Sequence, residues 1–360
     1  MQDQAHFSPR QHAHQRAQHL KLLQGVSRSF HLSIRLLPQA LQAPVAVGYL
    51  LARATDTVAD TSALPLPERQ TLLDAMSQTI ASQEPATAAL SAQAQAFAVQ
   101  QSDLHEQALM LALPQCLAWL HQLSAPDQAS VRTVLGHITR GQTLDMTRFD
   151  TGLQALQTEA ELSDYTWLVA GCVGEFWTEL CDRHLPGFAR LPTPDMMALG
   201  RAYGMGLQRL NIIRDAGADL IAGRCYWPED TLAAAGLSPQ ALANCARDND
   251  PSTRQALGPL WTAWLDQTQA QLNDGLLYSC ALNGWRLRLA SALPALIGAR
   301  TVALLRQAGP QALGQRVKMP RREVRTLLWR LAWGLVSPGA LRREFKRLSG
   351  PLTRQAPGKQ

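Results

Sequence analysis

Several features that identify common protein classes are missing from this chain of 360 residues. No apolar run reaches the roughly 18 residues that cross a bilayer, and the longest candidate, LASALPALIGA, contains Pro294. The polar, His-rich start lacks the apolar core of a signal peptide. The chain has neither a GxxxxGK[ST] phosphate loop nor a Cys/His spacing typical of zinc. We therefore expect neither a secreted nor a membrane-spanning protein, and neither a P-loop nor a zinc protein.

Cysteine usage and charge narrow the remaining classes. The six cysteines are scattered without a CxxC pair, which predicts reduced thiols in a cytosolic protein. A formal charge of +6 indicates an anionic partner, and nucleic acid is one alternative, although no RNP-type aromatic signature accompanies the charge. Ten Lys/Arg residues and only two acids lie between Arg316 and Arg347. This region predicts either an ordinary solvated helix face or a surface for an anionic substrate or an acidic membrane.

The hydrophobic pattern is that of helices, and alternating β-branched runs are almost absent. We predict one all-α domain over residues 20–350, with a polar tail at 1–19 and a short tail at 351–360. The low-complexity segment 83–101 predicts a loose connection between helices. The expected helices span residues 16–26, 44–61, 67–83, 104–123, 126–150, 161–184, 195–223, 239–247, 252–283, 285–308 and 321–335.

Two pairs of aspartates interrupt apolar helical segments at a spacing of four residues. Asp56 and Asp60 share a helix face with Arg53 in LARATDTVAD. A buried carboxylate is unfavourable unless a cation meets it. For one pair alone, a solvated end of a helix is the simpler interpretation.

The second pair makes the solvated interpretation much weaker. Asp215 and Asp219 continue a polar stripe that Gln208 and Asn211 begin on an otherwise apolar helix. If the two pairs face one another, four carboxylates surround a shared cavity. Oxygen ligands without His or Cys select a hard cation such as Mg²⁺, which completes its shell with phosphate oxygens. An all-α protein that binds diphosphate through metal in an apolar cavity points to isoprenoid diphosphates.

Four segments carry a resemblance to the squalene/phytoene synthase family. These are SRSF (27–30), LARATDTVAD (51–60), YTWLVAGCVG (165–174) and QRLNIIRDAGADLIAGRCYWPED (208–230). Their order and approximate spacing also agree, and the resemblance covers roughly residues 20–335. It implies the isoprenoid synthase fold, a helical bundle around a central cavity, and the head-to-head joining of two prenyl diphosphates with Mg²⁺.

Within the family, NIIRD followed by YWPED is similar to squalene synthases, and so is DTVAD. The resemblance then implies a prenyltransferase that condenses two farnesyl diphosphates through presqualene diphosphate and reduces this with NADPH to squalene. A non-reductive relative that makes dehydrosqualene, phytoene or presqualene diphosphate is the alternative, followed by a non-catalytic family member. The chain departs from eukaryotic squalene synthases at Ala59 and Ala218, where those enzymes usually carry an acid, so the number of Mg²⁺ ions stays open.

The resemblance also implies roles for individual residues. Tyr165 matches the tyrosine implicated in proton transfer, and the segment QRVKMPRRE implies NADPH contacts. Because the C-terminal membrane helix of eukaryotic relatives has no counterpart here, we expect a cytoplasmic protein that contacts the inner membrane surface through its basic C-terminal region. The implied metal ligands are Asp56, Asp60, Asp215, Asp219 and Asn211; the substrate-binding residues are Ser27, Arg28, Phe30, Arg53, Gln208, Asn211 and Arg214; and the NADPH-binding residues are Lys318 and Arg321.

Overall fold

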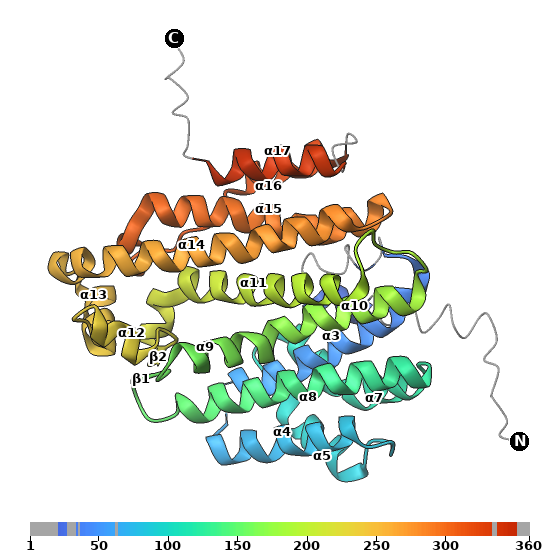
Figure 1. The fold of residues 1–360 in the computed structure, drawn as a ribbon. Helices are drawn as coiled ribbons and strands as arrows, with labels where there is room; N and C mark the ends of the chain where they lie inside the picture. Colours follow the sequence, from blue (N-terminus) through green and yellow to red (C-terminus); the bar gives the residue numbers. More distant parts are fainter. Residues whose placement is uncertain (1–20, 27–33, 35–36, 62–63, 333–336, 351–360) are drawn as a thin grey trace, which may run out of the picture. The chain divides into compact units, whose positions relative to one another are not determined.

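The computed structural model describes residues 21–26, 34, 37–61, 64–332 and 337–350, and these residues are mostly helical (Figure 1). The chain forms two compact units, each of which is described by itself. The N-terminal unit comprises Met1–Thr147 and Glu179–Pro186, and the C-terminal unit comprises Arg148–Thr178 and Gly187–Gln360. The expected single domain over 20–350 stays a prediction.

Helix α3 (Gln39–Asp60) is the central helix of the N-terminal unit. It contacts α4 (Leu66–Ala81), α6 (Leu104–Leu111) and α7 (Leu113–His121), and its Leu50, Leu51 and Val58 side chains are fully buried. We expected this helix to begin at Pro44, but it begins after Pro38, and Pro44 lies inside it. Proline removes one backbone hydrogen bond without ending the helix here, because burial of the neighbouring apolar side chains outweighs the loss.

The expected loose connection at 83–101 is wrong, because it contains helix α5 (Ala88–Ala98). The Thr87 hydroxyl caps the helix by accepting a hydrogen bond from the Leu90 N–H at 3.1 Å. Leu90, Ala94 and Phe97, at spacings of four and three, are buried. The abundance of Ala and Gln hides this short apolar stripe in the sequence. The expected helix 104–123 is likewise two helices, α6 and α7, divided at Ala112 before Pro114.

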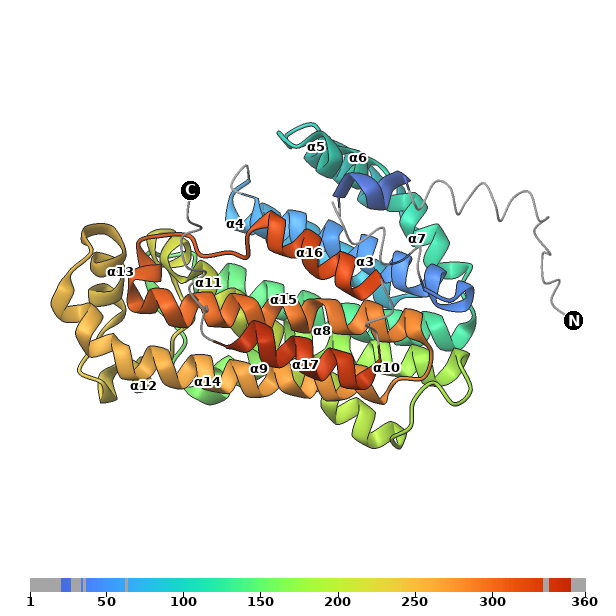
Figure 2. The same ribbon diagram turned by 90° about the horizontal axis from the view of Figure 1, so that it is seen from above.

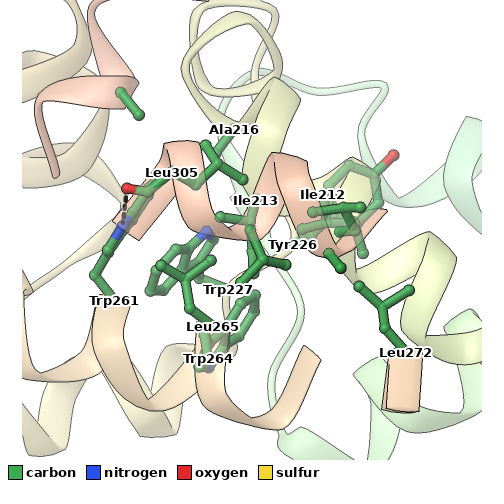
Figure 3. Packing of buried hydrophobic residues seen from close by; sticks show 14 of the residues in the cluster. Ile212, Ile213, Ala216, Tyr226, Trp227, Trp261, Trp264, Leu265, Leu272 and Leu305 are labelled. Carbon is green, nitrogen blue, oxygen red and sulfur yellow. Dashed lines mark hydrogen bonds between the residues drawn. The ribbon is translucent and has the colours of Figure 1, made fainter. Parts of the chain in front are cut away.

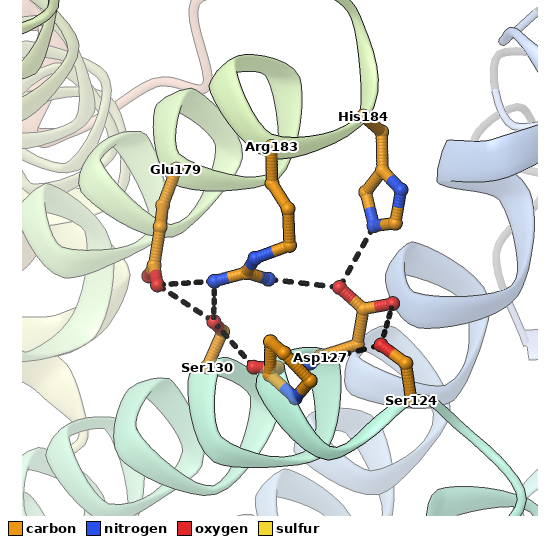
Figure 4. Close-up of polar contacts among 7 residues, drawn as sticks. Ser124, Asp127, Ser130, Glu179, Arg183 and His184 are labelled. Carbon is orange, nitrogen blue, oxygen red and sulfur yellow. Dashed lines mark hydrogen bonds and ion pairs between the residues drawn. The ribbon is translucent and has the colours of Figure 1, made fainter.

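A partly buried polar network around the buried Asp127 joins the start of α8 (Ala125–Arg148) to the end of α10 (Cys172–His184) within the N-terminal unit (Figure 4). Arg183 Nη1 donates to Asp127 Oδ1 at 2.8 Å, and His184 Nε2 lies 2.8 Å from the same oxygen. Ser124 Oγ donates to the other carboxylate oxygen at 2.8 Å. Burial alone would raise the pKa of Asp127, but the hydrogen bonds from His184, Ser124 and Arg183 together lower it.

Three long helices, α11 (Thr193–Ile221), α14 (Pro251–Ala281) and α15 (Trp285–Ala308), form the core of the C-terminal unit and run alongside one another (Figure 1). Tryptophans fill part of this core (Figure 3). Trp227 stacks on Trp264 with ring centroids 4.2 Å apart, and Trp261 Nε1 donates to the Leu305 carbonyl at 3.3 Å. The remaining elements of the unit are β1 (Gln154–Ala155), α9 (Glu159–Thr166), η1 (Trp167–Gly171), β2 (Arg224–Cys225), α12 (Glu229–Ala234), α13 (Pro239–Asp248), η2 (Gly309–Leu313), α16 (Arg321–Ala332) and α17 (Pro338–Ser349).

Glycines allow the backbone of α11 to contact the backbone of the segment η1–α10 directly. A Cβ at Gly204 would lie 2.2 Å from the Ala170 carbonyl oxygen, and one at Gly174 would lie 1.9 Å from the Gly200 carbonyl oxygen. The two segments therefore meet closely enough that any side chain at these positions forces them apart. This contact places the YTWLVAGCVG segment against the helix that carries Asp215.

Pro294 does not interrupt the apolar segment that we expected it to break. It lies inside α15, and in the described part of the chain the helical stretch Trp285–Leu313 is the one long and apolar enough, by length and composition, to cross a membrane. Half of its most apolar window is buried by the rest of the structure. Helix α15 packs against α14 and α17, and its buried Arg300 pairs with Glu323, so the stretch has the environment of a core helix.

Candidate active site

The first aspartate pair lies in the last two turns of α3. The Asp56 carboxylate is 37% exposed and lies 2.5 Å from Arg53 Nη1, while Asp60 is exposed at the end of the helix. Arg53 also donates through its other terminal nitrogen to Glu106 on α6. The guanidinium thus bridges two carboxylates, and it holds Asp56 in place by charge-assisted hydrogen bonds.

The surroundings of Asp56 disfavour its charged form. Burial is the largest cause, the neighbouring charge of Asp60 adds to it, and Arg53 opposes both; together they raise the pKa of Asp56 to about 6. The pKa stays raised even with Arg53 beside the carboxylate, so one arginine does not fully compensate the negative charge of Asp56. A divalent cation would supply the additional positive charge, because metal binding favours the deprotonated form of its ligand.

The second pair lies on the polar stripe of α11, as its spacing predicted. Gln208, Asn211, Asp215 and Asp219 are all partly exposed, whereas Leu210, Ile213 and Leu220 on the other side of the helix are buried. The Asn211 amide nitrogen lies 3.4 Å from Gln208 Oε1. The prediction of one polar face on an apolar helix is therefore confirmed.

Each aspartate of the second pair has its own arginine. The Arg214 guanidinium binds both oxygens of Asp215, with Nε 3.0 Å from Oδ1. Arg224 Nη2 donates to Asp219 Oδ1 at 2.9 Å. Two carboxylates and two guanidiniums therefore lie paired on α11 and β2. Carboxylate oxygens are ligands that Mg²⁺ prefers, and guanidinium groups are donors that phosphate oxygens accept.

Tyr165 lies at the end of α9, directly before the π-helical turn η1, and is buried. Its ring stacks on Tyr226 with centroids 5.2 Å apart, and Phe149 meets Tyr226 edge-on at 5.1 Å. A π-helical turn often marks a functional site, because it shifts the register of the side chains on either side. The π turn could not be predicted, since its residues fit a continuous helical pattern.

Two further residues of the site were missed by the sequence reasoning. Glu106 shares Arg53 with Asp56 although it lies 53 residues away in the chain, so no local pattern could reveal it. Arg224 pairs with Asp219 from β2, five residues later. Its position in the motif QRLNIIRDAGADLIAGRCYWPED, close to Asp219 in the chain, is the sequence feature that indicates this pairing.

The remaining predicted residues stand as follows. Ser27, Arg28 and Phe30 lie outside the described residues, and Lys318 and Arg321 are exposed at the start of the basic region. The donors that the aspartate helices offer are carboxylate and amide oxygens, which fits Mg²⁺. Within either unit, the described residues form no group of three or more His, Cys, Asp or Glu side chains arranged for a metal ion. Convergence of the two pairs on one site stays a prediction.

All six cysteines are buried and unpaired, as expected of reduced thiols. Burial raises the pKa of Cys116 and Cys172 to about 12 and raises that of Cys181 further. These groups are therefore neutral at physiological pH and behave as small apolar side chains.

Comparison with known proteins extends the resemblance that the motifs indicated. The chain is 27% identical over 290 residues to squalene synthase 1 of Arabidopsis thaliana. The aligned region covers 79% of this chain and 63% of that protein. It thus spans less than two thirds of the length of that relative.

Solved structures show the same fold. A complex of TcSQS with the ligand E5700 matches with a TM-score of 0.73 and 19% identity, over 92% of this chain and 89% of that one. A dehydrosqualene synthase in complex with ligand matches with a TM-score of 0.60 and 18% identity, over 91% of this chain and 98% of that one. The predicted all-α isoprenoid synthase fold is confirmed.

The squalene/phytoene synthase family profile matches residues 23–323, which include both aspartate pairs and Tyr165. The family is one of head-to-head prenyltransferases that typically use Mg²⁺ and bind prenyl diphosphates. The match extends over most of the chain. The chain belongs to the squalene/phytoene synthase family.

Proposed function

We propose that this protein is a Mg²⁺-dependent squalene synthase, which joins two farnesyl diphosphates head to head and reduces the resulting presqualene diphosphate with NADPH. The observation that carries the proposal is the pairing of arginines with the aspartates of both family motifs. Sequence relatives named squalene synthases support the choice of product, as do the segments NIIRD and YWPED. The proposal assigns Asp56 and Asp215 to one active site.

The first half of the reaction requires the departure of a diphosphate. Mg²⁺ bound by the aspartates would act as a Lewis acid for the leaving group. Arg53 and Arg214 each lie beside an aspartate and can turn from it to a phosphate oxygen, which keeps the excess negative charge paired. Gln208 and Asn211 can orient the diphosphate or a water molecule through their amide groups.

Tyr165 has two uses after ionisation. Its hydroxyl can take part in the proton transfer that closes the cyclopropane ring of presqualene diphosphate. Its ring, stacked on that of Tyr226, also supplies an electron-rich face beside a carbocation. The buried position of Tyr165 supports both uses, since exclusion of water prevents early capture of the cation.

The second half of the reaction needs a hydride. Lys318 and Arg321 are our candidates for contacting the phosphates of NADPH, and both side chains are exposed. Non-reductive members of the family stop before this step. The likeness to a dehydrosqualene synthase structure keeps a non-reductive product as the second candidate.

One assay separates the two candidates. The purified protein is given farnesyl diphosphate and Mg²⁺, with and without NADPH, and the products are identified by mass spectrometry. We expect squalene only when NADPH is present. The same product in both reactions would reject the reductive assignment and leave the head-to-head synthase.

A second assay tests whether the two aspartate pairs act together. Asp56→Asn and Asp215→Asn are compared singly and combined, with turnover measured across a Mg²⁺ titration. Ligands of one cluster give strongly non-additive losses, because either change alone already disables the site. Losses that multiply independently would mean that the two pairs serve separate purposes.

A further inference from the structure

We propose that helices α16 and α17 form a membrane-docking surface that binds bilayers containing anionic phospholipids. The inference deepens the expectation of membrane contact from the basic composition by assigning it to particular side chains. It does not depend on which reaction the site performs.

The basic side chains of this region are all exposed to solvent, whereas Glu344 is buried and Glu323 is partly buried. Glu323 pairs with Arg300 of α15 at 2.6 Å, and Glu344 is buried between Arg330 and Arg347, with contacts of 3.0 and 2.6 Å. Two acids against ten cations leave the region strongly positive, even though Glu344 partly offsets the charge of Arg330 and Arg347. The exposed basic residues are Arg316, Lys318, Arg321, Arg322, Arg325, Arg330, Arg342, Arg343, Lys346 and Arg347.

The same two acids hold the surface together. Glu323 anchors α16 to α15, and Glu344 joins α16 to α17 through Arg330. Helix α17 packs on α14 and α15 (Figure 2), and Leu327 and Leu331 of α16 belong to the buried cluster of the unit. The cations are thus displayed on fixed helices rather than on a loose tail.

Apolar side chains are exposed on α16 among the cations. Trp329 is 65% exposed and Leu328 is 44% exposed, while Leu327 and Leu331 on the inner side are buried. Trp329 lies four residues after Arg325 and seven after Arg322, so the three share one face of the helix. A solvated helix does not need an exposed tryptophan on its basic face.

This combination favours a membrane over nucleic acid or an acidic protein segment. An amphipathic helix binds a bilayer when Lys/Arg side chains meet anionic headgroups and a Trp or Leu enters the acyl boundary. Nucleic-acid backbones are met by cations alone, and bases that stack on a tryptophan require single strands. The occupant we assign is therefore the anionic surface of a bilayer.

The test is co-sedimentation of the full chain with vesicles, without substrate. Vesicles of phosphatidylcholine alone are compared with vesicles that also contain phosphatidylglycerol. We expect binding only to the second kind, weakened by salt. The variant Arg322→Gln/Arg325→Gln/Arg343→Gln should bind them about 100-fold more weakly, because each basic residue near an anionic surface contributes roughly fivefold.

A matched variant controls for net charge. Arg140→Gln/Arg247→Gln/Arg286→Gln removes the same number of exposed cations from other surfaces. It should bind as the unchanged chain does. Equal losses in the two triple variants would show that overall charge, and not this surface, attracts the protein, which would overturn the proposal.

The apolar contribution has its own pair of variants. Leu328→Ser/Trp329→Ser should lower binding to anionic vesicles about tenfold, whereas Val99→Ser/Leu104→Ser, which removes two side chains each 74% exposed, should leave it unchanged. Circular dichroism checks that each variant is folded. Tighter binding to single-stranded RNA than to vesicles, with no effect of the Leu328/Trp329 change on either, would reject the membrane in favour of nucleic acid.

Discussion

The carboxylate of Asp56 provides a direct test of the active-site interpretation, because its charge should oppose folding in the absence of metal. Burial and the nearby Asp60 raise its pKa from 3.8 to about 6, even though Arg53 lies beside it. A raised pKa means that the folded chain binds more protons than the unfolded chain between these two values. Stability therefore falls as pH rises through this window, and the loss is complete above it.

The magnitude follows from the shift. Two pKa units correspond to about 3 kcal/mol at ~1.4 kcal/mol per unit. Since 37% of the side chain is exposed, solvent screening reduces the value to about 1–1.5 kcal/mol. Asp56→Asn, which cannot be charged, should raise the free energy of unfolding by that amount at pH 8. The gain should shrink toward zero at about pH 4, where Asp56 of the unchanged chain is itself protonated.

Urea denaturation at pH 8 and pH 4, without divalent cations, measures both values. Asp74→Asn, an exposed carboxylate on α4, is the matched control and should change stability by less than ~0.5 kcal/mol. The stabilised Asp56→Asn variant should also have lost most of its turnover. Destabilisation of this variant at pH 8, or a gain of equal size at both pH values, would refute the reasoning.

Three further predictions follow from the packing and the polar contacts. Asp127→Asn should lower the free energy of unfolding by about 3 kcal/mol in urea denaturation. Because the folded-state pKa of Asp127 is lowered, the stabilisation that its carboxylate gives the unchanged chain is present above about pH 4 and is lost as the pH falls below that value. Gly204→Ala should lower the free energy of unfolding by about 2–3 kcal/mol in the same assay, because the new methyl group forces α11 away from η1. The control Gly258→Ala, which has open space around the new methyl group, should raise it by up to about 1 kcal/mol. Equal effects of the two changes would contradict the close contact. Tyr165→Phe should reduce turnover of farnesyl diphosphate at least about 100-fold with little change in melting temperature, while Tyr226→Phe retains most of the turnover; similar losses in both would assign the effect to the stack rather than to the hydroxyl.

The long helices could be predicted from the sequence because their apolar spacing is local and repeats over many turns. Helix α15 begins and ends where the pattern placed it, and the polar stripe from Gln208 to Asp219 lies on one face of α11 as predicted. Short or compositionally biased segments gave a weaker signal. Helix α5 was missed because one short stripe of three buried residues does not stand out among alanines and glutamines.

The sequence by itself determined the helical class, the family motifs and the two aspartate pairs, since each depends on residues within a few turns of one another. Only the tertiary structure decided which groups those aspartates meet: Glu106 competes for Arg53, and Arg224 pairs with Asp219. It likewise decided that the acids of the basic region face inward and leave Trp329 exposed among cations. The physical reason is the same in each case: partners of a charge are set by the packing of helices that are distant in the chain, and no local spacing encodes that packing.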